Sequence, residues 1–203
     1  MLGVRLAAVV LTTVAVLLPN AAESADGNRC TITGTPGRDV LRGTAGPDVI
    51  CGLGSDDAIF GGRGDDVLRA GRGGDVLNPG LGDDIVIGKL GRDVVSYGGE
   101  NVRVVVNLHL GWGNGAGFDL LHGIDGAVGG PLRDRLFGSS GNDVLRAYDG
   151  NDVLRGRGGD DGLLGGSGAD YLFGGPGDDF LSGQGGTDVC RQGSGHGGRV
   201  GCP

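Results

Sequence analysis

The chain has 203 residues, of which 49 are glycine, and its formal net charge is −8. This acidic balance argues against a nucleic-acid-binding protein, because such proteins carry a basic surface. The glycine content predicts a large entropic cost of ordering the backbone, so the fold needs a source of stability beyond a small apolar core.

Residues 1–25 have the pattern of a secretory signal peptide. Arg5 lies near the start, an apolar run extends from Leu6 to Leu18, and Pro19 and small residues follow. The run is too short to span a bilayer comfortably, so we expect no membrane span, and an uncleaved anchor is the alternative. We expect a secreted, extracellular protein whose mature chain begins with a lead-in at residues 26–33.

A nine-residue unit repeats along most of the remaining chain. It is clearest at residues 165–173, and its template is Gly-Gly-x-Gly-x-Asp-x-apolar-x. Seven consecutive copies occupy residues 34–96 and seven more occupy residues 129–191. Aspartate fills the sixth place in all fourteen copies, while the fourth-place glycine is missing only at Ser55 and Leu132, and the eighth-place aliphatic residue only at Cys190.

The residue types of the unit favour a calcium-binding turn followed by a short strand. The glycines allow positive φ and bring backbone carbonyl oxygens close together, and the aspartate adds a hard anionic oxygen. In the last three places the middle side chain points inward, because side chains alternate across a strand. Two units make one coil of eighteen residues, so each aspartate should lie beside the aspartate eighteen residues later.

This stacking predicts that a cation is needed for folding. Carboxylates about 5 Å apart repel each other by roughly 0.8 kcal/mol even in water, and two blocks of seven loops give ten such pairs. The summed repulsion, on the order of 8 kcal/mol, is comparable with the stability of an ordinary domain. Bound Ca²⁺ would turn the repulsion into shared ligation, so binding free energy would become folding free energy.

The repeats resemble the hemolysin-type calcium-binding nonapeptides of the RTX family. The resemblance implies an all-β fold, a parallel β-roll that is a right-handed β-solenoid of 18-residue coils, with up to about ten Ca²⁺ ions. Full occupancy would reverse the sign of the net charge, so we expect weak or empty sites near Leu132 and beside Arg38, Arg92 and Arg133. The alternative is that the aspartates only form turns. The predicted ligands are Asp39, Asp48, Asp57, Asp66, Asp75, Asp84, Asp93, Asp134, Asp143, Asp152, Asp161, Asp170, Asp179 and Asp188.

In the first block, residues 34–96, the eighth places predict a narrow aliphatic core. The seventh places are also apolar and should point outward, for which β propensity is one explanation and self-association through a flat apolar surface is the other. The inward row is Leu41, Ile50, Ile59, Leu68, Leu77, Val86 and Val95, and the outward row is Val40, Val49, Ala58, Val67, Val76, Ile85 and Val94.

Residues 97–128 break the rhythm and form a non-repeat β insert. The alternating residues 102–110 predict one long strand, residues 111–115 a loop, and residues 118–125 a return to the roll. We expect the insert to continue the stack within one elongated domain, with two rolls joined by a hinge as the alternative. Trp112 lies in the predicted loop, where it has a packing role or, alternatively, contacts a ligand.

The second block, residues 129–191, has the inward residues Leu136, Leu145, Leu154, Leu163, Leu172, Leu181 and Cys190. Its ninth places alternate Phe137, Arg155, Phe173 and Arg191 on one sheet, which predicts either a stacked aromatic–guanidinium ladder or a plain solvated face. The glycine-rich tail, residues 192–203, is expected to be mobile apart from Cys202.

The four cysteines predict two disulfides in an exported chain. Three pairings are possible, and we favour Cys30–Cys51 and Cys190–Cys202, because each would protect the nearer end of a solenoid. A zinc site is disfavoured because none of the cysteines has C-x-x-C spacing.

No reactive constellation is visible, so the chain is predicted not to be an enzyme. His109, His122 and His196 are scattered and no HExxH motif occurs. Two classes of function remain. The first is a secreted calcium-binding scaffold or surface protein, and the second is a calcium-dependent recognition module for a glycan or protein partner.

Overall fold

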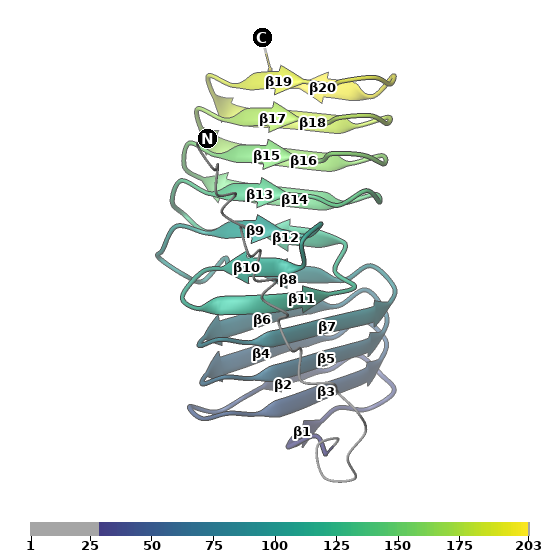
Figure 1. The fold of residues 1–203 in the computed structure, drawn as a ribbon, viewed down its shortest axis with the longest axis vertical. Helices are drawn as coiled ribbons and strands as arrows, with labels where there is room; N and C mark the ends of the chain where they lie inside the picture. Colours follow the sequence, from purple (N-terminus) through teal and green to yellow (C-terminus); the bar gives the residue numbers. More distant parts are fainter. Residues whose placement is uncertain (1–28, 203) are drawn as a thin grey trace, which may run out of the picture.

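The computed structural model describes residues 29–202 and contains only strands, turns and bends over that range. The predicted signal, residues 1–25, lies outside the described residues, as do residues 26–28 of the lead-in. Figure 1 shows one elongated stack of coils with β1 at one end and β19 and β20 at the other. Among residues 29–202 no helix is long and apolar enough to cross a membrane. The all-β solenoid predicted from the repeat is confirmed.

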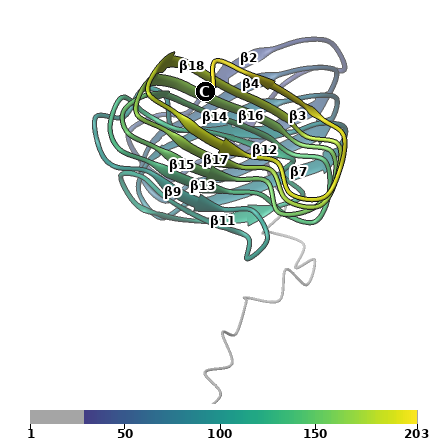
Figure 2. The same cartoon turned by 90° about the horizontal axis from the view of Figure 1, so that it is seen from above.

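Outside the insert, consecutive strands alternate between two sheets, which face each other across each coil when the stack is seen from above (Figure 2). The eleven-strand sheet has the order β1 (Ile32–Thr33), β3 (Val49–Gly54), β5 (Val67–Arg72), β7 (Ile85–Leu90), β11 (Phe118–His122), β10 (Trp112–Asn114), β9 (Val105–Asn107), β13 (Arg135–Phe137), β15 (Val153–Arg155), β17 (Tyr171–Phe173) and β19 (Val189–Arg191). The nine-strand sheet has the order β2 (Val40–Arg42), β4 (Ala58–Arg63), β6 (Val76–Leu81), β8 (Val94–Ser96), β12 (Gly126–Val128), β14 (Val144–Asp149), β16 (Gly162–Gly168), β18 (Phe180–Gly186) and β20 (Gly198–Val200).

The core is the row of eighth-place side chains. Parallel pairing in the register of eighteen residues places Leu136 beside Leu154 and Leu154 beside Leu172. These side chains are fully buried, as are those of the first block except Leu41 in the first coil, which is partly buried. The seventh-place residues of the first block face outward, with Val40 63% and Val76 45% exposed. Self-association through this row stays a prediction.

The insert continues both sheets but follows a different path from the predicted one. Only Val105–Asn107 of the expected long strand is a strand, because a turn at Leu108–Gly111 ends it. The expected loop at residues 111–115 contains β10, which pairs antiparallel with β9 and with β11. Strand β11 then pairs parallel with β7, and β12 joins β8 to β14. The turn at Leu108–Gly111 sends the chain back on itself, so that β9 and β10 form two adjacent layers of the eleven-strand sheet.

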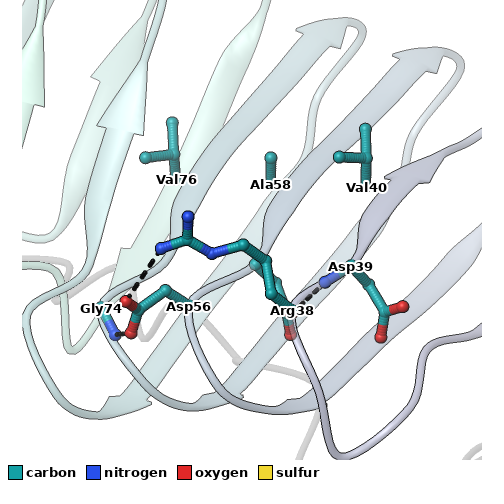
Figure 3. A pocket seen from close by; sticks show the side chains of 8 residues that line it. Arg38, Asp39, Val40, Asp56, Ala58, Gly74 and Val76 are labelled. Carbon is teal, nitrogen blue, oxygen red and sulfur yellow. Dashed lines mark hydrogen bonds and ion pairs between the residues drawn. The ribbon is translucent and has the colours of Figure 1, made fainter.

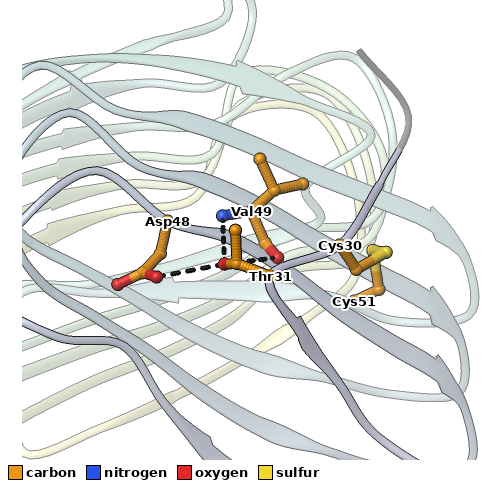
Figure 4. The surroundings of a disulfide bond; sticks show 5 residues. All are labelled: Cys30, Thr31, Asp48, Val49 and Cys51. Atoms are coloured by element: carbon orange, nitrogen blue, oxygen red, sulfur yellow. Dashed lines mark hydrogen bonds between the residues drawn. A yellow bond between two sulfur atoms is a disulfide. The ribbon is translucent and has the colours of Figure 1, made fainter. Parts of the chain in front are cut away.

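A disulfide holds each end of the stack. The favoured pairings Cys30–Cys51 and Cys190–Cys202 are both present. At the N-terminal end the Thr31 hydroxyl lies 3.0 Å from Oδ1 of Asp48 and accepts the N–H of Val49 over 2.9 Å (Figure 4). The tail, which was predicted to be mobile apart from Cys202, contains β20 (Gly198–Val200), which pairs with β18. The second disulfide and this pairing give the tail a place in the roll.

Replacing Leu163 by alanine should lower the free energy of unfolding by about 2–5 kcal/mol, because its fully buried side chain would leave a cavity in a core only one residue wide. Leu164→Ala is the matched control, because its side chain is on the outer face of the same strand and only partly buried; it should cost less than about 1 kcal/mol. Chemical denaturation in saturating Ca²⁺ measures both. Equal losses would show that the inward row is not the core.

Candidate metal-binding loops

The fourteen repeat aspartates form two ladders, one along each edge of the roll. In each step the backbone N–H of one aspartate donates to Oδ1 of the aspartate eighteen residues later, over 2.7–3.0 Å. All fourteen are buried except Asp39, which is partly buried. The ten steps are Asp39–Asp57, Asp48–Asp66, Asp57–Asp75, Asp66–Asp84, Asp75–Asp93, Asp134–Asp152, Asp143–Asp161, Asp152–Asp170, Asp161–Asp179 and Asp170–Asp188.

The second carboxylate oxygen separates the aspartates into two groups. In the later member of each of the ten steps, Oδ2 is buried and has no hydrogen-bond partner: Asp57, Asp66, Asp75, Asp84, Asp93, Asp152, Asp161, Asp170, Asp179 and Asp188. A buried anionic oxygen without a partner is costly, so each of these atoms needs a positive group.

The other four aspartates begin the two blocks, and their own turns satisfy Oδ2. The N–H groups of Thr35, Thr44, Gly130 and Ser139 donate to Oδ2 of Asp39, Asp48, Asp134 and Asp143, respectively, over 2.5–2.7 Å. The division therefore follows position in the stack. It does not follow the neighbouring arginines, because Asp93 beside Arg92 has an unpartnered Oδ2.

The first-place glycines show what surrounds the unpartnered oxygens. A Cβ built on Gly52 would lie 2.5 Å from Oδ2 of Asp57 and 2.5 Å from the carbonyl oxygen of Ala70 in the next coil. Oxygens from two successive coils thus face one small space. Among residues 29–202 no three carboxylate, imidazole or thiol groups converge on a metal position, so backbone carbonyls would have to complete any coordination shell. Hard oxygen donors of this kind fit Ca²⁺.

In the ten units that follow another unit on the same edge of a block, the second and fourth places adopt positive φ, whereas the first-place glycines, which the sequence pattern also suggested, do not. Gly62 and Gly64 have φ of 109° and 108°. Ser55 has φ of 70° in a fourth place, so the turn keeps its shape there without glycine. This backbone geometry repeats from coil to coil and keeps the carbonyl groups in the same positions.

Comparison with known families agrees with this geometry. The pattern of the RTX calcium-binding nonapeptide repeat matches four times, at residues 33–68, 61–95, 128–163 and 164–197. The chain belongs to the RTX calcium-binding nonapeptide repeat family. The matched residues cover both blocks and more than half of the chain. No curated protein matches the chain at a significant level. RTX repeats bind calcium, so the cation that suits these loops is Ca²⁺.

The RTX ladders continue through the insert, which the sequence analysis missed. The N–H of Asp84 donates to Oδ1 of Asp119 over 3.1 Å, and the N–H of Asp93 donates to Oδ2 of Asp125 over 3.0 Å. Residues 114–122 are in fact a degenerate repeat, with Gly115, Gly117 and Asp119 at its second, fourth and sixth places. This spacing is present in the sequence, but the residues on either side of it do not follow the repeat, so the unit was not recognised.

A third hydrogen-bond pattern lies at the fifth place of the RTX unit, and sequence reasoning did not predict it. Oδ1 of Asp56 accepts the N–H of Gly74 over 2.9 Å, and its other oxygen accepts from Arg38 over 3.2 Å (Figure 3). Equivalent bonds run from the N–H groups of Asp83, Phe118, Asp160, Ala169, Asp178 and His196 to the fifth-place Asp or Asn one coil earlier. These exposed side chains support the turns from outside.

Burial raises the pKa of several unpartnered RTX aspartates, namely Asp57, Asp66, Asp84, Asp93, Asp152, Asp161, Asp170 and Asp179. Loss of solvent is the main cause and the charge of the next aspartate adds to it, bringing the pKa of Asp66 and Asp84 to about 6 and that of Asp152 and Asp161 to about 7. Asp48 differs, because hydrogen bonds from Thr44 lower its pKa. Among the other aspartates that open a block, burial raises the pKa of Asp134 and Asp143 although hydrogen bonds from their own turns oppose the shift, so a satisfied Oδ2 reduces the cost of the buried charge without removing it.

Tyr97 gives the insert aspartate a partner that the repeat aspartates lack. Its hydroxyl donates to Oδ2 of Asp119 over 2.6 Å, and the whole side chain is buried. Burial, followed by the charge of Asp119, raises the tyrosine pKa, which keeps the hydroxyl protonated. Nearby, Glu100 accepts the N–H of Ala116 through Oε2, while its Oε1 is buried without a partner. A neutral phenol thus satisfies this loop where other loops require a cation.

The raised pKa values predict an inverted pH dependence for the metal-free protein. The folded state favours protonated aspartates, so their contribution is present below the unfolded pKa near 4 and is lost as pH rises through about 6–7. The calcium-depleted protein should have a higher thermal midpoint at about pH 5 than at about pH 8. In saturating Ca²⁺ the thermal midpoint should instead be higher at about pH 8 than at about pH 5, because ligation requires deprotonated carboxylates. Circular dichroism melts measure this, and a calcium-free midpoint independent of pH would contradict it.

Replacing Tyr97 by phenylalanine should lower the free energy of unfolding by about 1–3 kcal/mol, because it leaves Oδ2 of Asp119 buried without a donor. Tyr171→Phe removes the same hydroxyl from a side chain that is 47% exposed, so it serves as the control and should change stability little. Urea titrations in Ca²⁺ compare the two variants. A Tyr97→Phe protein as stable as the control would show that the phenol does not replace a cation.

Proposed function

We propose that the chain is a secreted calcium-binding RTX protein that folds when Ca²⁺ binds between its stacked loops. In this proposal it acts as a structural or surface scaffold without catalytic activity. The observation that carries the proposal is the set of ten buried, unpartnered Oδ2 atoms, one in each loop that follows another loop on the same edge of a block. An ordinary turn-forming aspartate has its oxygens satisfied, as the four opening aspartates do.

The ten unpartnered oxygens support about ten ions. Each ion would be bound by a carboxylate oxygen and by backbone carbonyl oxygens from two successive coils. Ion binding would therefore join neighbouring coils. Asp39, Asp48, Asp134 and Asp143 would complete the first loops through their backbone rather than through a free carboxylate oxygen. The expected weak sites beside Arg38, Arg92 and Arg133 remain predictions.

The extracellular part of the proposal is supported by the sequence and by the disulfides. Two bridges close the described chain, and such bonds persist in oxidising compartments. The apolar run of residues 6–18 favours export, and extracellular modules of this kind need only millimolar Ca²⁺. The non-catalytic part is supported by the scattered histidines and the lack of a zinc motif in the sequence.

Calcium removal tests the proposal directly. At about pH 8, where the repeat aspartates are charged, circular dichroism should show β structure in Ca²⁺, loss of that structure on chelation, and recovery when Ca²⁺ is restored. Mg²⁺ should restore little, because it requires a tighter octahedral shell.

A pair of adjacent aspartates provides the matched control. Asp66→Asn removes the charge of a buried, unpartnered carboxylate and should raise the calcium concentration at the folding midpoint several-fold. Asp65→Asn changes an exposed carboxylate whose Oδ1 accepts a hydrogen bond that asparagine can also accept, so its midpoint should stay within about twofold of the wild type. A roll that keeps its spectrum in chelator, or identical midpoints for the two variants, would refute the calcium-folding proposal.

A further inference from the structure

One outer face of the second block has a composition unlike the rest of the molecule. Along β13–β19 of the eleven-strand sheet, the side chains that point outward form what we call the arginine face. It contains three arginines, three aromatic residues and no acidic residue, in a chain of net charge −8. Its members are Arg135, Phe137, Val153, Arg155, Tyr171, Phe173, Val189 and Arg191.

The aromatic rings hold two of the guanidinium groups in place. The guanidinium carbon of Arg155 lies 5.9 Å from the ring centre of Phe137 and 5.3 Å from that of Phe173, one coil away on either side. Arg191 lies 6.0 Å from the ring of Phe173 on its other side. The ladder predicted as one alternative from the sequence is therefore present. Fixed rings reduce the entropy that an arginine loses when it binds a ligand.

These arginines have no carboxylate partner in the described part of the chain. The ion pairs among residues 29–202 join Arg38 to Asp56 and His196 to Asp178, and neither involves the arginine face. Arg135, Arg155 and Arg191 are exposed, so their N–H donors point to solvent. A hollow of about 270 Å³ lies between Arg135, Phe137, Val153 and Arg155. Unpaired guanidinium groups on a rigid support are suited to binding carboxylate or sulfate groups.

The dimensions of the face favour a single extended chain as its ligand. A three-residue strand is roughly 10 Å long, and this length sets the width of the arginine face. Along the stack, arginines two coils apart, such as Arg155 and Arg191, are separated by roughly 10 Å. Exposed carboxylates line both borders, with Asp149 on one side and Asp160 and Asp178 on the other. A broad anionic surface such as a bilayer would meet these carboxylates, whereas a linear polymer that follows the arginine row would not.

We propose that the arginine face binds a linear acidic polysaccharide, lying along the axis of the roll and held by Arg135, Arg155 and Arg191. The guanidinium groups would bind its carboxylate or sulfate groups, and the exposed Tyr171 would pack against its sugar rings. This role goes beyond calcium-dependent folding, because the binding groups belong to the strands and not to the calcium loops.

The test measures binding of the calcium-loaded full chain to dextran sulfate and to carboxymethyl dextran, with unmodified dextran of equal length as the neutral probe. Both charged polymers should bind, with an affinity that falls as salt rises, and unmodified dextran should not. Arg155→Gln combined with Arg191→Gln should weaken binding about tenfold or more, since each change removes charge-assisted hydrogen bonds. Arg135→Gln, which breaks no ring contact, should weaken binding as well, and it replaces the double variant if that variant fails to fold.

Arg42→Gln is the matched control. Arg42 also stacks on a ring, with its guanidinium carbon 4.3 Å from the centre of Phe60, but it lies in the nine-strand sheet of the first block. The affinity of the Arg42→Gln protein for both polymers should stay within about twofold of that of the wild type. The proposal would be overturned if Arg42→Gln lost as much affinity as the arginine-face variants, or if no variant lost affinity. Binding of carboxymethyl dextran alone would indicate bridging by calcium, and binding of phosphatidylserine vesicles in place of both polymers would indicate a membrane ligand; either would also overturn it.

Discussion

The structure depends on how one buried aspartate meets the next. In every step of the ladders one carboxylate oxygen accepts a backbone N–H from the preceding coil, which fixes the spacing and register of the stack. In the ten steps within the two repeat blocks, the other oxygen of the later aspartate is buried with its charge unmatched. The hydrogen bond that aligns the coils therefore creates the electrostatic problem that a divalent ion solves, so alignment and ion binding cannot be separated.

The repetitive part of the fold could be predicted from the sequence because each repeat meets a copy of itself. Once the eighteen-residue coil is known, the eighth-place residues must face inward, and Leu154 and Leu172 are indeed neighbours in the core. The same translation placed the aspartates side by side in ten pairs, and the structure has an unpartnered Oδ2 atom in the later member of each of these pairs. The disulfides followed from the need to close both ends of a solenoid.

The insert could not be predicted in the same way, because its contacts join residues that are different from each other. Alternation in residues 102–110 predicts a strand but not where a turn ends it, and the antiparallel pairing of β10 depends on partners from two distant segments. The role of Tyr97 depends on one buried hydroxyl reaching Asp119, which leaves no periodic signal. The fifth-place hydrogen bonds were missed for another reason, since exposed Asp and Asn residues in turns have several ordinary explanations.

The four aspartates that open the two blocks bear on the order in which the chain acquires its shape. Their Oδ2 atoms are satisfied within their own turns, so the opening turn of each block needs no cation to balance this oxygen. Each new coil then places its carboxylates against backbone that is already in position. Removing the last coil of a block would therefore take away one step from each ladder and leave the hydrogen bonds between the earlier coils unchanged.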